Sequence, residues 1–78
     1  MYKKYEIKFD RISNLKFEDN VQKYDVVVLT NDPEVEGEYH PHHSSCTIRG
    51  FEAPIDQVLS EEFVEGQIVA RTGYTSTL

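Results

Sequence analysis

Four side chains that could bind a metal ion lie within seven residues of this sequence, at His40, His42, His43 and Cys46. In an extended chain His40 and His42 point to the same side about 6 to 7 Å apart, whereas His40 and Cys46 lie about 20 Å apart. The four can share one ion only if Ser44 and Ser45 turn the chain back. The spacing also lacks the paired ligands of structural zinc sites. The stretch suggests a metal-binding domain as one hypothesis, and an exposed loop with an incidental histidine cluster as the simpler one.

The same stretch invites two catalytic readings. A reactive thiolate needs a positive, partly exposed setting, but this half of the chain is acidic, so we expect Cys46 to be a buried, small apolar residue. A histidine paired with a nearby glutamate could perform acid–base chemistry, which makes a small enzyme a third hypothesis. No glycine-rich loop that would hold a phosphate is present, because the four glycines stand apart. We therefore predict no catalytic residue and no cofactor.

Two groups of glutamates stand out for their spacing. Three occupy alternate positions after Pro33, and three follow each other closely near the end of a predicted helix; they are Glu34, Glu36 and Glu38, and Glu61, Glu62 and Glu65. Alternate residues of a strand share one face, where like charges repel. Acids at a helix C-terminus oppose the helix dipole. Since a basic partner would relieve both repulsions, we predict that these six residues bind a partner protein.

The charge is unevenly distributed along the chain. Up to Tyr24 six Lys or Arg face four acids, whereas from Asp25 onward two Arg face ten acids, and the net charge is −6. Nucleic-acid binding requires clustered cations that displace counterions from phosphates. We therefore expect no direct nucleic-acid binding and a partner protein with a basic surface.

Length and composition indicate one small domain. The chain has 78 residues, of which 38% are hydrophobic, and no apolar run approaches the length needed to span a bilayer. No apolar segment of a signal peptide follows the N-terminal lysines. With one cysteine, no internal disulfide can form. We expect a cytoplasmic protein without a membrane segment, and dimerisation is one way in which so small a chain gains stability.

The run of β-branched residues at 24–30 predicts a central strand, since it is apolar and ends at Asn31-Asp32-Pro33. Residues 4–12 alternate apolar and polar side chains, which predicts a half-buried strand antiparallel to 22–30. Residues 13–23 hold many turn formers and predict a long loop. We expect Leu15 and Phe17 in this loop to fold back onto the core.

The rest of the chain predicts three further strands and one helix. The strands are expected at 34–39, which pairs back on 24–30, at 47–51 with a bulge or close approach at Gly50, and at 67–71. Apolar residues at helical spacing predict a helix over 54–65, with Pro54 in its first turn and Gly66 just past its end. Residues 72–78 are expected to form a flexible tail. The pattern predicts a single α+β domain at 1–78, with a mainly antiparallel sheet of four to five strands and one helix packed on one face.

Taken together, these features favour a non-enzymatic, acidic interaction module. Its partner is expected to be a protein whose basic surface, such as a nucleic-acid-binding groove, it covers as a small inhibitor or regulator. The metal-binding domain and the small enzyme remain the alternatives.

Overall fold

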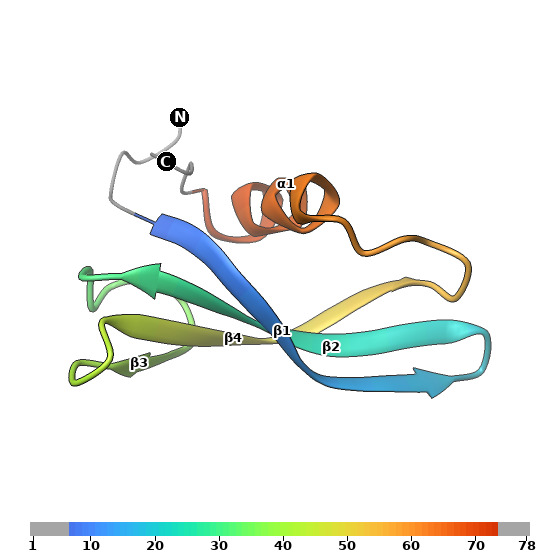
Figure 1. The fold of residues 1–78 in the computed structure, drawn as a ribbon, viewed down its shortest axis with the longest axis horizontal. Coiled ribbons are helices and arrows are strands. Elements are labelled where there is room, and N and C mark those ends of the chain that lie inside the picture. Colours follow the sequence, from blue (N-terminus) through green and yellow to red (C-terminus); the bar gives the residue numbers. More distant parts are fainter. Residues whose placement is uncertain (1–6, 74–78) are drawn as a thin grey trace.

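A computed structural model describes residues 7–73 of the chain. Four strands form one antiparallel sheet in the order β1-β2-β4-β3, and α1 lies on one side of it (Figure 1). The elements are β1 (Ile7–Glu18), β2 (Val21–Thr30), β3 (Glu38–His40), β4 (Ser45–Pro54) and α1 (Glu61–Thr72). The predicted α+β fold with one helix on one face of an antiparallel sheet is confirmed. Residues 4–6 of the first predicted strand and 74–78 of the predicted tail lie outside the described residues.

The β1–β2 hairpin confirms the predicted antiparallel pairing but is longer than expected. The predicted loop at 13–23 is wrong, because β1 continues to Glu18 and turns through Asp19 and Asn20 alone. Both turn residues have positive φ, 49° and 62°, as a two-residue hairpin turn of the primed type requires. Asx residues tolerate this left-handed backbone better than other non-glycine residues. Of the residues at 13–23, only Asp19 and Asn20 form the turn, and the others belong to β1 or β2.

β4 separates β3 from β2. Residues 31–37 cross the end of the sheet, and β3 then pairs with β4, so the predicted pairing of 34–39 with the central strand is wrong. Gly37 makes this crossing possible: its φ is +114°, and a Cβ there would lie 2.4 Å from the backbone oxygen of Thr47. Gly50, with φ +83°, lies where β4 has one residue more than β2, between the pairs Tyr24–Phe51 and Val26–Ile48, which confirms the predicted bulge.

The helix lies further along the chain than predicted. The helix predicted at 54–65 and the strand predicted at 67–71 are replaced by α1. Ser60 is its N-cap, and the side chain of Ser60 accepts a hydrogen bond from the Phe63 amide at 3.2 Å. Gly73 ends it in the left-handed conformation with its N–H bonded to the Val69 carbonyl. Thr72 is therefore helical and does not belong to a tail.

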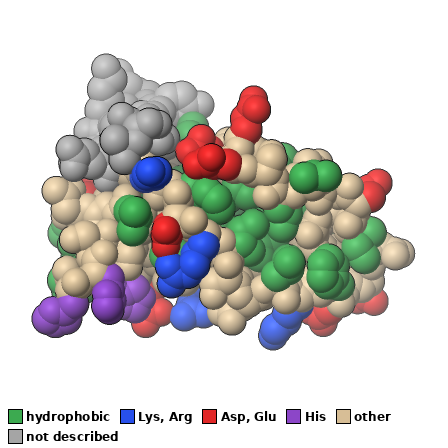
Figure 2. Space-filling view, viewed as in Figure 1, with side chains coloured by type: hydrophobic (Ala, Val, Ile, Leu, Met, Phe, Trp, Pro, Cys, Tyr) green, Lys and Arg blue, Asp and Glu red, His purple; other side chains and the backbone are tan. Residues whose placement is uncertain are grey.

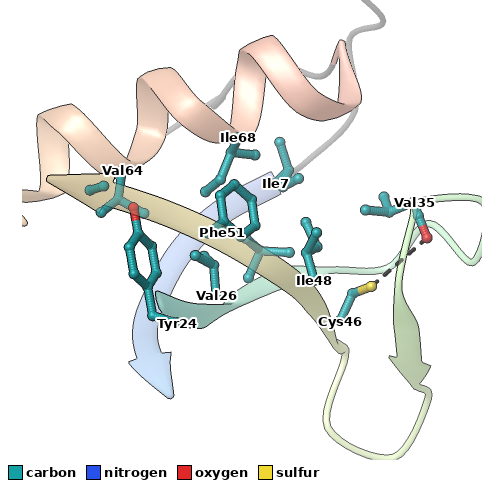
Figure 3. Packing of buried hydrophobic residues seen from close by; sticks show 11 residues of the cluster. Ile7, Tyr24, Val26, Val35, Cys46, Ile48, Phe51, Val64 and Ile68 are labelled. Carbon is teal, nitrogen blue, oxygen red and sulfur yellow. Dashed lines mark hydrogen bonds between the residues drawn. The ribbon is translucent and has the colours of Figure 1, made fainter. Parts of the chain in front are cut away.

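The core lies between the helix and the sheet. Val64 and Ile68 of α1 are buried against the face that carries Tyr24, Val26 and Phe51 (Figure 3). The Tyr24 and Phe51 rings stack with centroids 5.9 Å apart. Cross-strand neighbours share a face, so the register extends this apolar face from β4 through β2 to β1.

Buried amides attach the helix and the segment before it to the sheet. Gln22 is 4% exposed, and its side-chain amide donates to the carbonyls of Pro54 and Gln57 at 2.8 and 2.6 Å. On α1, Gln67 accepts a hydrogen bond from the Tyr24 hydroxyl and donates one to the Glu52 carbonyl. Because the Gln22 amide is buried, its two bonds replace water that the amide loses on folding, and they hold the segment before α1 against the sheet.

Candidate functional site

The histidine stretch forms the β3–β4 hairpin and does not gather around one point. His40 ends β3, His42 and His43 lie exposed in the loop at 41–44, and Cys46 is in β4. Cys46 pairs with Tyr39, whereas His40 pairs with the next residue, Ser45. Successive residues of a strand face opposite sides, so the thiol and the His40 ring lie on opposite faces of the sheet. Among residues 7–73, no group of three or more His, Cys, Asp or Glu side chains could hold a metal ion.

Cys46 is buried, which confirms the expectation of a small apolar residue. It is 0% exposed, and its thiol points to the Val35 carbonyl at 3.8 Å (Figure 3). The Glu36 carbonyl lies 3.3 Å from the same thiol. Burial, reinforced by the charges of Glu36 and Glu38, raises the pKa of the Cys46 thiol. Because a nucleophile requires the thiolate, this environment opposes thiol catalysis.

Glu38 and His40 are a glutamate and a histidine at alternate positions of β3, and their charges interact. The Arg49 guanidinium, however, donates to Glu38 at 2.9 Å. This hydrogen bond and the Arg49 charge lower the pKa of Glu38, away from the neutral range in which a general base works best.

The first glutamate group does not line one strand face, as the sequence predicted. Only Glu38 is in a strand; Glu34 follows a turn in which its amide bonds to the Asp32 carboxylate at 2.9 Å. Glu36 accepts hydrogen bonds from Arg71 at 3.3 Å, and Glu38 accepts from Arg49. Two of the three charges are therefore met by cations within the fold, and their predicted repulsion is relieved without a partner.

The second glutamate group lies at the opposite end of the helix from the one predicted. Glu61 and Glu62 occupy the first turn of α1, where they complement the helix dipole, and Glu65 lies one turn later. The premise that these charges cost folding energy is thus wrong. Within residues 7–73 none of the three makes an ion pair, and Glu61 and Glu62 are exposed. This group is therefore the one whose charge remains available.

Apolar side chains gather at one end of the molecule, a feature that sequence reasoning missed. Of the five large hydrophobic residues exposed within 7–73, four lie there and form what we call the apolar end: Leu15, Phe17, Ile55 and Val58, which are 44, 60, 47 and 75% exposed. Figure 2 shows hydrophobic side chains gathered between the helix and the β1–β2 hairpin. The expectation that Leu15 and Phe17 fold back onto the core is therefore wrong.

The apolar end is exposed because the hairpin extends past the helix. The second half of α1 packs over the start of β1, where Ile68 and Val69 lie beside Ile7 and Phe9. The far end of β1 has no helix above it. Alternation along the sequence could have indicated the exposed strand, since Leu15 and Phe17 are two residues apart, but only the position of α1 shows that they lack cover.

A hollow of about 470 Å³ lies on the charged part of the sheet. Its lining includes three cations, Lys16, Lys23 and Arg49. Lys23 lies within 4.0 Å of Glu18 and Glu52, and Arg49 pairs with Asp25 and Glu38. Since acids offset Lys23 and Arg49, the hollow offers no concentrated positive site for a phosphate.

No protein-family model, curated protein or solved structure matches this chain. Among the helices of residues 7–73, none has the length and apolar character needed to cross a membrane.

Proposed function

We propose that this protein is a non-enzymatic interaction module that binds a basic surface of a partner protein through the acids of α1. The observation that carries the proposal is the contrast between the two glutamate groups. Glu36 and Glu38 are held by arginines of the same chain, whereas Glu61 and Glu62 are exposed on the helix surface without an ion pair in the described part of the chain. Uncompensated surface charge steers association with a surface of opposite sign.

The distribution of cations supports the same proposal. Arg11, Lys23, Arg49 and Arg71 each lie within 4.0 Å of a carboxylate of this chain. With a net charge of −6, the surface left over is acidic, and α1 carries three of its acids close together. Such a surface is repelled by phosphate backbones and attracted to basic proteins.

A nucleic-acid-binding groove is one basic surface of this kind. A module that covers it would act as an inhibitor or regulator of the partner, because the acids of α1 would occupy the place of phosphates. A single, buried cysteine without a disulfide fits the reducing cytoplasm, which is the location we propose.

The test compares two charge-neutralised variants. In one, Glu61, Glu62 and Glu65 are changed to Gln; in the matched control, Glu34, Glu36 and Glu38 are changed to Gln. Proteins captured from cell extract by the wild type are purified, and their association rates are measured at rising salt concentration. We expect the helix variant to bind more slowly and with a weaker salt dependence, because screening acts within about 8 Å at physiological ionic strength. Competition by duplex DNA then shows whether the partner's nucleic-acid site is covered.

Wild-type rates and salt dependence in both variants would show that the acids only keep the protein soluble. A loss in the control variant alone would move the binding surface to the β3 side of the sheet.

A further inference from the structure

The apolar end forms one continuous surface across two strands and the segment before α1. Phe17 of β1 pairs with Gln22 of β2, so both lie on the helix side of the sheet. Leu15 precedes Phe17 by two residues, beside a register shift in β1 between Ser13 and Lys16, and is likewise exposed. The Gln22 amide holds the carbonyls of Pro54 and Gln57. This places the segment with Ile55 and Val58 next to the hairpin. Contiguous exposed apolar surface of this kind typically marks an interaction site, whereas single exposed residues do not.

Acidic residues frame this surface. Asp19 lies in the hairpin turn, Asp56 lies between Ile55 and Val58 in sequence, and Glu61 and Glu62 begin the helix that follows. Within residues 7–73 none of these four acids makes an ion pair. Figure 2 shows acidic side chains next to the hydrophobic ones on this face.

Within residues 7–73, the two lysines nearest the apolar end lie on the opposite face of the sheet. Lys16 and Lys23 are cross-strand partners one position before Phe17 and one position after Gln22, so alternation directs both to the opposite face of the sheet. A ligand over the apolar end therefore meets apolar side chains in the centre and negative charge around them.

We propose that the apolar end, framed by Asp19, Asp56, Glu61 and Glu62, seats an amphipathic basic segment of the partner protein. This rests on the proposed function and adds where and how the partner binds. An apolar centre with a charged rim is the usual anatomy of a protein interface. The rim selects lysine and arginine flanks, and the apolar end buries the partner's hydrophobic side chains. A second copy of this chain would bring a second acidic rim against the first.

The direct probe is a short peptide of Leu and Lys only, with the leucines on one helical face. A scrambled peptide of the same composition disperses the leucines, and a third peptide carries Glu in place of Lys. Binding to the full chain is followed by fluorescence anisotropy. We expect the amphipathic Leu/Lys peptide to bind about tenfold more tightly than the scrambled one, and the Leu/Glu peptide not to bind, because both the apolar face and the positive charge are recognised.

Two protein variants separate the apolar contact from the charge. Phe17→Ser together with Val58→Ser should weaken binding of the amphipathic peptide about tenfold or more. Leu29→Ser is the matched control, because Leu29 is 41% exposed but lies outside the apolar end. Asp56→Asn with Glu61→Gln and Glu62→Gln should weaken binding about threefold to tenfold at low salt and lose this effect at high salt. Circular dichroism checks that each variant is folded.

Each outcome decides between the two proposals. If the charge variant weakens binding but the Phe17/Val58 variant equals Leu29→Ser, the seating site is refuted while the acidic module survives. If neither variant affects binding of the captured partner, both proposals fail. Sedimentation showing that the wild type alone forms a dimer that Phe17→Ser disperses would assign the apolar end to a second copy and overturn the inference.

Discussion

Arg71 should contribute more to the stability of this domain than any ordinary surface arginine. From the last turn of α1, its guanidinium donates to the carbonyls of Arg49 and Gly50 at 2.7 and 3.2 Å. It also pairs with Glu36 at 3.3 Å and lies 5.1 Å from the centroid of the Phe51 ring. One side chain therefore attaches the end of the helix to the bulge in β4 and to the segment before β3.

The expected cost of Arg71→Ala follows from these contacts. Charge-assisted hydrogen bonds to carbonyls are worth about 1 kcal/mol each at a site of this exposure. The ion pair adds about 0.3 kcal/mol and the cation–π contact about 0.5 to 1 kcal/mol. The free energy of unfolding should fall by about 3 kcal/mol, out of about 4 to 12 kcal/mol expected for a domain of this size. The melting temperature should fall by about 12 to 24 °C.

Urea unfolding followed by circular dichroism measures the change. Arg71→Lys keeps the charge but not the planar fork, so it should lose about half as much. Glu36→Gln isolates the ion pair and should cost less than about 0.5 kcal/mol. Arg11→Ala is the matched control, because among residues 7–73 the polar contact of the exposed Arg11 guanidinium is with the neighbouring Asp10 carboxylate. If Arg71→Ala unfolds at the same urea concentration as Arg11→Ala, the contacts assigned to Arg71 do not stabilise the fold.

Three further predictions concern the backbone, the helix start and the thiol. Gly37→Ala should unfold the domain or cost several kcal/mol, since its Cβ would lie 2.4 Å from the Thr47 carbonyl oxygen, whereas Gly66→Ala, with nothing within 4 Å, should stabilise it by about 0.5 to 1 kcal/mol in thermal unfolding. If Gly37→Ala and Gly66→Ala change the melting temperature equally, the surroundings assigned to these two glycines are wrong. Ser60→Ala should cost about 1 kcal/mol by losing the N-cap, and no loss in urea unfolding would argue against a helix start at 61. Because its folded-state pKa is raised, Cys46 should add stability that is complete below the unfolded pKa of about 8.5 and is lost as pH rises above it. When melting temperature is plotted against pH across this range, it should fall more steeply for the wild type than for Cys46→Ala. Equal slopes would contradict the argument.

The local pattern of the sequence was enough to predict the fold class and the antiparallel pairing of the first two strands, though not the short turn between them. A β-branched run that stops at proline favours a strand, and alternation in the first segment selected its antiparallel partner. Cys46 was predicted to be buried on the same local grounds. The bulge at Gly50 was marked by glycine inside a strand pattern. These features depend on side chains within a few residues of each other, so the sequence by itself determines them.

The extent and place of the elements were decided by tertiary contacts. Apolar residues at 55, 58 and 59 have helical spacing, yet Gln22 holds the carbonyls of this segment from across the sheet and the helix begins only after Ser60. Ser60 followed by Glu61 and Glu62 is typical of a helix start, but the apolar spacing led the prediction to place these residues inside a helix that begins at 54.

The two glutamate groups and the apolar end show why the candidate binding surface could not be predicted from the sequence alone. Whether Glu36 is free depends on Arg71, which lies 35 residues away and reaches it only because α1 crosses the sheet. Whether Phe17 is buried depends on where α1 stops covering β1. The sequence determined which residues are charged or apolar, whereas their partners and their exposure were decided by contacts between distant segments, which local periodicity does not encode.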